Sequence, residues 1–205
     1  MRFQSNPTLL EMNSVICLED LKRVYGEQTT WSNIPREYWQ RLADNGYSLL
    51  WLMGVWERSP GSRMCALSEQ ELLREYDQAL PGWNEADVAG SPYAVRAYRP
   101  DSAFGSKKEL AALKEHLNHV GIGLILDFVP NHLALDHPWT LSNPDRFIHA
   151  RQEQYAENPH SFMTTRNGDI LAHGKDPYFP PWRDTVQVNY FMPEARKAMI
   201  DILLE

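Results

Sequence analysis

Two short runs of consecutive apolar residues constrain the fold of this chain more than any other feature of its sequence. They occupy residues 48–53 (SLLWLM) and 122–126 (IGLIL), and such runs are typical of strands that are covered on both faces. Strands of this kind belong to parallel sheets, in which helices join one strand to the next. Helical patterns follow Pro35 and span residues 107–120, as this arrangement requires. The sequence therefore predicts an α/β fold assembled from β-α-β units.

The remaining elements are predicted from weaker signals. We expect a first strand within residues 12–18, although two polar residues interrupt its apolar pattern. The string SEQE at residues 68–71 has the form of a capping box and predicts a short helix to about residue 80. A last helix is expected to begin near Pro193. Residues 133–185 are rich in Pro, His, Asn and aromatic side chains without strong periodicity, which predicts an inserted small subdomain.

Composition and charge exclude several classes of function. Of the 205 residues, 43% are hydrophobic, so the chain can form a core and is not disordered as a whole. The 20 Lys and Arg residues oppose 27 Asp and Glu residues, which gives a net charge of −7, and no basic run offers a surface for nucleic acid. No apolar stretch approaches the ~18 residues of a membrane span, and no secretory signal is recognised. We therefore expect neither a nucleic-acid nor a membrane partner, and a cytoplasmic location.

Side chains that can act in binding or catalysis lie directly after the second apolar run, in the string Asp127-Phe128-Val129-Pro130-Asn131-His132. In parallel α/β proteins the carboxyl ends of the strands, with the loops that follow them, form the functional face. Asp127 and His132 are therefore candidate site residues. Taken alone, an Asp at a strand end followed by a His also fits a structural role, in which the carboxylate is solvated or paired with a partner.

The full string resembles the first signature region of glycoside hydrolase family 13, the α-amylase family. Four further segments resemble that family: residues 50–56 (LWLMGVW), 91–95 (SPYAV), 176–182 (DPYFPPW) and 184–190 (DTVQVNY). The resemblance covers the chain from about residue 30. It implies a partial (β/α)8 TIM barrel of about three strands, with a B-domain-like segment inserted after the third strand. It also implies a retaining mechanism on α-linked glucans.

Under this resemblance the chain divides into four stretches. Residues 1–30 form an amino-terminal segment with room for the first strand, and residues 31–132 form the first part of the barrel. Residues 133–185 form the inserted B-like subdomain, and residues 186–205 start the third barrel helix. A complete barrel takes about 250 residues, and the family's nucleophilic Asp, acid/base Glu and stabilising Asp follow strands four, five and seven. We therefore expect an amino-terminal fragment that contains no catalytic residue and is inactive alone.

By the same resemblance, four residues receive roles. Tyr93 is expected to stack under the sugar at the cleavage point, and His132 to hydrogen-bond the hydroxyl groups of that sugar. Asp127 is expected to orient other site residues. Asn131 is a candidate calcium ligand, because an amide oxygen suits a hard cation. No other cofactor is expected, and the expected partner is an α-linked glucan or maltooligosaccharide.

Alternatives to these interpretations stay open. A non-catalytic carbohydrate-binding or interaction module with the same barrel ancestry is the second class of function, since a fold does not guarantee activity. Tyr93 also fits a packing role at the barrel rim. Glu57 and Arg58 follow the first of the two apolar runs, and they fit either a substrate groove or an ion pair that holds a loop.

Overall fold

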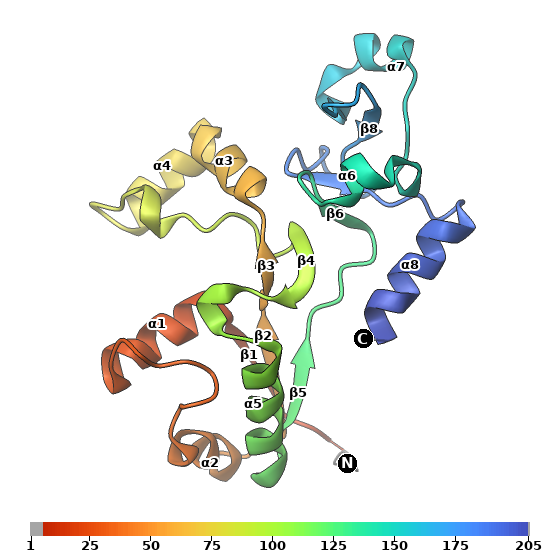
Figure 1. The fold of residues 1–205 in the computed structure, drawn as a ribbon. Coiled ribbons are helices and arrows are strands. Elements are labelled where there is room, and N and C mark those ends of the chain that lie inside the picture. The colour runs from red at the N-terminus through yellow and green to blue at the C-terminus, as the bar shows by residue number, and fades with distance from the viewer. Residues whose placement is uncertain (1–5, 205) are drawn as a thin grey trace. The chain divides into compact units, whose positions relative to one another are not determined.

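The computed structural model describes residues 6–204, and the chain divides into two compact units (Figure 1). Unit 1 comprises Met1–Glu57 and Arg99–Asp127, and unit 2 comprises Arg58–Tyr98 and Phe128–Glu205. Each unit is therefore built from two separate stretches of the chain, and each has its own hydrophobic core. None of the helices within residues 6–204 has the length and apolar character of a membrane span.

The sheet of unit 1 is parallel, as the two apolar runs predict. Its strands lie in the order β1-β2-β5, and the register places Trp51 between Glu11 and Ile125. The elements of this unit are β1 (Leu9–Asn13), α1 (Ser14–Tyr25), α2 (Arg36–Asp44), β2 (Leu49–Met53), η2 (Ser102–Phe104), α5 (Lys107–His119) and β5 (Gly123–Leu126). The helix after Pro35 and the helix over residues 107–120 are both confirmed within two residues.

The two faces of this sheet are buried to different extents. On one face, Leu50 and Leu52 of β2 are 1% and 0% exposed and share a core with Leu113 and Leu117 of α5. On the other face, Leu9 of β1 and Ile125 of β5 are among the exposed apolar side chains. The prediction that both faces are covered is therefore wrong for this structure, because the buried side chains of the helices pack on one face only.

The first strand lies earlier than the sequence predicts. A strand within residues 12–18 is wrong, since Ser14 already begins helix α1. The side chain of Asn13 explains this boundary, because its Oδ1 accepts hydrogen bonds from the backbone N–H groups of Val15 (3.1 Å) and Ile16 (3.4 Å). The polar residue that interrupts the strand pattern is thus the N-cap of a helix.

Two consecutive helices follow in unit 2, where the sequence predicts one. Helix α3 spans Pro60–Ser68, with Ser59 as its N-cap and Pro60 in its first turn, and α4 spans Gln70–Ala79. The predicted capping box at residues 68–71 is wrong. The hydroxyl of Ser68 donates instead to the carbonyl oxygen of Cys65 (2.8 Å), and the N-cap residue Glu69 makes no side-chain cap.

The segment predicted as an insertion has regular structure and contributes to the core of unit 2. Leu133, Phe147 and Leu171 are fully buried there, together with Met199 of α8. Strand β6 pairs with β9, and β7 with β8, both antiparallel. The further elements are η1 (Glu85–Asp87), β6 (His132–Ala134), α6 (Trp139–Ser142), η3 (Pro144–Arg146), α7 (Gln152–Glu157), η4 (Pro159–Ser161), β7 (Phe162–Thr164), β8 (Ile170–Ala172), β9 (Thr185–Gln187) and α8 (Pro193–Leu204). A separate two-stranded sheet is formed by β3 (Trp56–Arg58) and β4 (Val95–Pro100).

Truncation of one side chain on the packed face tests the core of unit 1. We expect Leu52→Ala to lower the free energy of unfolding by about 3 kcal/mol, because it removes buried methyl groups and leaves a cavity. The matched control is Leu203→Ala on α8, where the side chain is exposed and the change should stay below about 0.5 kcal/mol. Urea denaturation followed by tryptophan fluorescence measures both. Equal effects of the two substitutions would contradict the assignment of Leu52 to a packed core.

Candidate functional site

Asp127 directly follows β5 in unit 1, and the end of β2 holds its carboxylate. The indole Nε1–H of Trp51 donates to Oδ1 (2.8 Å), and the backbone N–H of Gly54 donates to Oδ2 (2.6 Å). The indole Nε1–H of Trp56 donates to the carbonyl oxygen of Asp127 (2.7 Å). Gly54 has a φ of 77°, a conformation that glycine adopts without strain. The carboxylate at the strand end is thus paired, as partial burial of a charge requires.

His132 begins β6 in unit 2, and its burial keeps the imidazole neutral. The residue is 8% exposed, and this desolvation lowers the pKa of His132 below its ordinary value. The carboxylate of Asp184 and a hydrogen bond with the backbone of Tyr93 oppose the shift without reversing it. The side-chain Nδ2 of Asn131 lies 3.2 Å from Nδ1 of the ring. Because an amide nitrogen only donates, this contact is a hydrogen bond when the ring proton lies on Nε2.

Two aromatic residues lie at His132. The ring centroid of Trp182 is 5.0 Å from that of His132, with the planes tilted by 56°. Tyr93 meets His132 through its backbone, and its own side chain is exposed to 39%. The structure therefore brings Tyr93 and His132 together within unit 2 and leaves the phenol ring accessible. Trp182 was not singled out in the sequence, although it lies in a segment that resembles the family.

Gly174 lies against His132 and leaves no room for a side chain. A Cβ at this position would lie 2.8 Å from Cβ of His132 and 2.5 Å from Oγ1 of Thr185. Both distances are shorter than van der Waals contact, so any larger residue would displace one of these neighbours. Gly174 is therefore a positioning residue for His132, and no local pattern in the sequence distinguishes it from the other glycines.

Asn131 fastens the start of β6 to the end of β9. Its Oδ1 accepts a hydrogen bond from Nε2 of Gln187 (2.9 Å), and the same Nε2 donates to the backbone oxygen of Asn131 (2.9 Å). Its Nδ2 lies 3.3 Å from the carbonyl oxygen of Lys175 and 3.3 Å from Oε1 of Gln187, so these two acceptors and Nδ1 of His132 share its two N–H groups. Three neutral oxygens thus gather at Asn131. Within residues 6–204 there is no group of three or more His, Cys, Asp or Glu side chains that could hold a metal ion.

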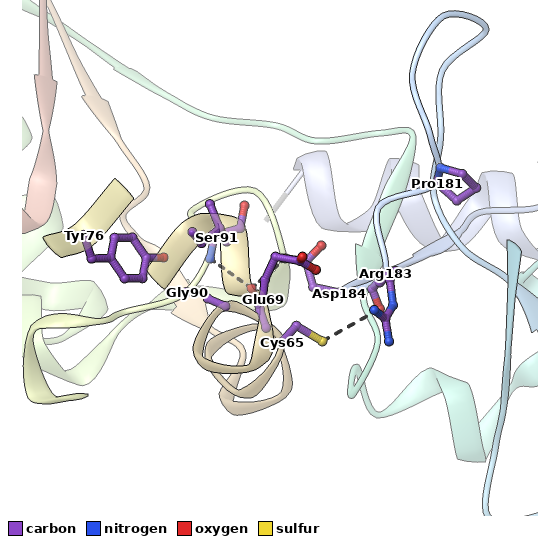
Figure 2. Close-up of a pocket in the computed structure, with 11 residues that line it drawn as sticks. Cys65, Glu69, Tyr76, Gly90, Ser91, Pro181, Arg183 and Asp184 are labelled. Atoms are coloured by element: carbon purple, nitrogen blue, oxygen red, sulfur yellow. Dashed lines mark hydrogen bonds between the residues drawn. The ribbon is translucent and has the colours of Figure 1, made fainter. Parts of the chain in front are cut away.

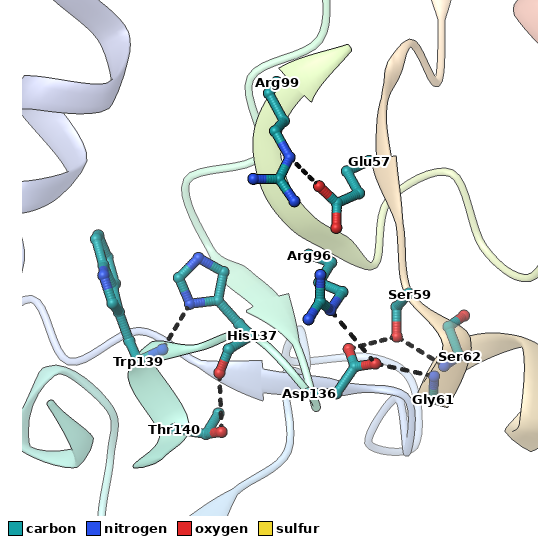
Figure 3. Close-up of polar contacts among 10 residues, drawn as sticks. All are labelled: Glu57, Ser59, Gly61, Ser62, Arg96, Arg99, Asp136, His137, Trp139 and Thr140. Carbon is teal, nitrogen blue, oxygen red and sulfur yellow. Dashed lines mark hydrogen bonds and ion pairs between the residues drawn. The ribbon is translucent and has the colours of Figure 1, made fainter. Parts of the chain in front are cut away.

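Asp136 joins the inserted segment to the start of α3 (Figure 3). The hydroxyl of Ser59 donates to its Oδ1 (2.6 Å), the backbone N–H of Gly61 donates to its Oδ2 (3.0 Å), and Nε of Arg96 lies 4.0 Å from Oδ2. Burial lowers the pKa of the neighbouring His137 to about 4, so this imidazole is neutral at physiological pH. These polar groups therefore serve to hold unit 2 together.

Glu57 and Arg58 each engage a neighbour. Glu57 forms an ion pair with Arg99 within unit 1, which Figure 3 shows. The Nη1–H of Arg58 donates to the carbonyl oxygen of Gly90 (3.0 Å) within unit 2. The sequence left two roles open for Glu57 and Arg58, a substrate groove or an ion pair that holds a loop. These contacts match the second role.

Curated proteins resemble parts of this sequence, although no family model matches the chain. It is 31% identical over 135 residues to the 1,4-alpha-glucan branching enzyme GlgB of Nocardia farcinica, a match that covers 60% of this chain and 18% of that enzyme. GlgB of Mycobacterium tuberculosis is 33% identical over 105 residues, which are 45% of this chain and 14% of that enzyme. A stretch of 55 residues is 38% identical to the mouse amino acid transporter heavy chain SLC3A1 and covers 26% of this chain and 8% of that protein.

Solved structures resemble nearly the whole chain. An alpha-amylase from Lactobacillus plantarum matches with a TM-score of 0.57 and 22% identity, over 97% of this chain and 35% of that one. The alpha-amylase from H. orenii matches with a TM-score of 0.53 and 19% identity, over 98% of this chain and 38% of that one. At these identities the likeness concerns the fold alone. The chain spans less than a fifth of the branching enzymes and less than two fifths of these amylases.

The influence of Asp184 on His132 can be measured directly. We expect Asp184→Asn to lower the pKa of His132 further, because the carboxylate favours the charged imidazolium. The control is Asp145→Asn, since the Asp145 side chain is 87% exposed and should leave the pKa of His132 unchanged. Proton NMR titration of the His132 ring measures both variants. A raised or unaltered pKa in the Asp184 variant would contradict the assignment.

Proposed function

This chain belongs to the α-amylase family, glycoside hydrolase family 13, and we propose that it supplies part of the substrate-binding side of an enzyme that acts on α-linked glucans. The observation that carries this proposal is the buried neutral imidazole of His132, beside Trp182 and the backbone of Tyr93. The ring nitrogens now contact Asn131 and the backbone of Tyr93, and sugar hydroxyl groups, which both donate and accept, can take the place of either contact. The resemblance to 1,4-alpha-glucan branching enzymes supports an α-glucan or maltooligosaccharide as the substrate.

Within this proposal the motif residues have distinct roles. The exposed ring of Tyr93 stacks under a sugar, and His132 hydrogen-bonds the hydroxyl groups of that sugar. Asp127 orients other site residues. Its two oxygens accept from Trp51 and Gly54, and each oxygen retains a second lone pair for a further donor. No residue of this chain is assigned as nucleophile or as acid/base, and the chain alone is proposed to be inactive.

We propose that β1, β2 and β5 are the first three strands of a (β/α)8 barrel and that residues 133–185 form an inserted B-like subdomain. The unequal faces of the sheet support this reading. The face that carries Leu9, Trp51 and Ile125 also carries the polar residues Glu11 and Asn13 of β1. In a closed barrel the inner face is filled by side chains from alternate strands. The partial exposure of Leu9 and Ile125 is what an incomplete set of such layers produces.

Calcium at Asn131 is a separate part of the proposal. Calcium prefers oxygen ligands, and Oδ1 of Asn131, Oε1 of Gln187 and the carbonyl oxygen of Lys175 are of the suitable type. These three oxygens are ligands of the type that calcium binds. They carry no charge, however, and the carboxylates that usually complete a calcium site are not among them. No step of the reaction is assigned to the metal. Titration of calcium by calorimetry tests this part of the proposal. If the Asn131→Ala variant bound calcium as tightly as the wild type does, calcium binding at Asn131 would be excluded.

The alternative function is a non-catalytic carbohydrate-binding or interaction module with the same barrel ancestry. The match to the mouse transporter heavy chain favours it, since that protein is described as part of an amino acid transporter. Coding sequence downstream separates the two functions, because an enzyme should carry an Asp-Gly-Phe-Arg-x-Asp-like string there. The expected cytoplasmic location stays a prediction, which cell fractionation would test.

Substitution of Tyr93 tests the proposed sugar contact. We expect Tyr93→Ala to weaken maltotriose binding about tenfold, which corresponds to about 1.4 kcal/mol, because the apolar face for stacking is lost. Tyr93→Phe is the matched control and should bind nearly as the wild type does, since it keeps the ring. Titration of intrinsic tryptophan fluorescence measures the affinity. Equal affinities of the Ala variant and the wild type would exclude Tyr93 as a sugar platform.

Activity of residues 1–205 alone is the second test. We expect no measurable release of reducing sugar from starch or maltooligosaccharides. Retaining hydrolysis needs two carboxyl groups roughly 5 to 5.5 Å apart. Among Tyr93, Asp127, Asn131 and His132, only Asp127 carries a carboxyl group, and its oxygens already accept hydrogen bonds. A reducing-sugar assay measures this. If the wild-type chain released reducing sugar and the His132→Ala variant did not, the expectation of an inactive fragment would be wrong.

A further inference from the structure

Unit 2 contains a cavity of about 360 Å³ whose lining includes neither Tyr93 nor His132 (Figure 2). We call it the Cys65 pocket and define it by Cys65, Glu69, Tyr76, Ser91, Arg183 and Asp184. These residues come from α3, from the start and the middle of α4, and from two loops that are distant in the sequence. Its volume lies within the usual range of small-molecule sites.

The polar floor of this pocket is fixed by hydrogen bonds. The buried hydroxyl of Ser62 donates to Oδ2 of Asp184 (2.6 Å) and accepts from the backbone N–H of Ser91 (2.9 Å). No hydrogen bond from the described residues reaches Oδ1 of Asp184. The fixed carboxylate therefore presents one oxygen that can accept from a ligand.

The chemistry of the lining selects a neutral ligand rich in hydroxyl groups. Glu69 and Asp184 bring two carboxylates and Arg183 one guanidinium, so the pocket is negative overall and repels phosphates and other anions. Carboxylates accept hydrogen bonds from hydroxyl groups, whereas a guanidinium donates to them. Ala66 and Leu72 complete the lining with apolar surface. Alternating hydroxyl groups and C–H surface are characteristic of a sugar.

One loop joins this pocket to His132. Pro181, Arg183 and Asp184 line the pocket, while Trp182, which lies between them in the sequence, packs against the ring of His132. The carboxylate of Asp184 also acts electrostatically on His132. A ligand that occupies both places would therefore contact a single short stretch of chain, as adjacent units of one oligosaccharide do.

We propose that the Cys65 pocket is a second saccharide subsite, which binds a further glucosyl unit of the α-glucan whose neighbouring unit lies at His132. The proposal rests on the proposed function and adds a site that includes none of Tyr93, Asp127, Asn131 and His132. Glu69 and Asp184 accept hydrogen bonds from the sugar, and Arg183 donates to it. The subsite favours chains of at least two glucosyl units over free glucose.

The thiol of Cys65 provides a direct readout of occupancy. The full chain, with any polypeptide that continues its reading frame, is alkylated by iodoacetamide with and without saturating maltotriose. Trypsin cleaves after Arg63 and Arg74, so residues 64–74 report Cys65 by mass spectrometry separately from every other cysteine. We expect alkylation of Cys65 to slow about tenfold with maltotriose, because a bound sugar excludes the reagent. Alkylation of Cys17, which lies in unit 1, should not change.

Matched variants test the chemistry of the subsite. Glu69→Gln and Arg183→Ala should each weaken maltotriose binding several-fold, since each removes a hydrogen bond to a charged group. Glu71→Gln and Arg166→Ala are the controls, because both residues are exposed and lie outside the pocket. All four side chains are exposed, so loss of folding is not expected to confuse the comparison.

The outcomes separate this proposal from the proposed function. Maltotriose that changes tryptophan fluorescence without protecting Cys65 would overturn the subsite and leave sugar binding at Tyr93 and His132 intact. Protection by glucose 6-phosphate in preference to maltotriose would also overturn it, since the pocket would then select an anion. If maltotriose caused no change in fluorescence and did not protect Cys65, both proposals would be contradicted.

Discussion

The hydrogen bonds to the carboxylate of Asp127 are the interaction on which the carboxyl-end edge of the unit 1 sheet depends. Parallel pairing of β2 with β5 brings the ends of the two strands together, so the first residue after β5 meets the turn after β2. One donor is the Trp51 indole, and the other is the Gly54 backbone. Because Trp51 stands on the less buried face of the sheet, the charge stays where water or a partner can solvate it. The packed face would impose a much larger desolvation cost.

The parallel sheet could be predicted because its signals lie in short, continuous stretches of the sequence. Two apolar runs of strand length and the helical patterns between them are sufficient for parallel strands and connecting helices. The first strand could not be placed correctly, since the capping function of Asn13 exists only when the N–H groups of Val15 and Ile16 point toward it. Helix α3 has a local signal in Ser59-Pro60, an N-cap residue followed by proline, which is not a capping box.

The environment of His132 shows what a motif leaves out. The string that ends in His132 identifies the imidazole, but Gly174, Trp182 and Asp184 lie more than 40 residues further along the chain. They reach it through the antiparallel pairing of β6 with β9, which sets His132 opposite Gln187. Each of these strands has three residues, too few for a periodic pattern to reveal their register. The sequence alone identifies His132 as a candidate site residue, whereas the pKa of its imidazole depends on the burial and the neighbours that the fold provides.

Asp184 couples the two places at which unit 2 is proposed to hold a sugar. Ser62 fixes one of its oxygens, so the carboxylate cannot turn away when a ligand arrives. A hydroxyl group that donates to the other oxygen would spread the negative charge and weaken its pull on a proton at His132. The pKa of His132 would then fall further, and the imidazole would stay neutral over a wider range of pH. Occupancy of the Cys65 pocket would thus favour the neutral form of the His132 imidazole.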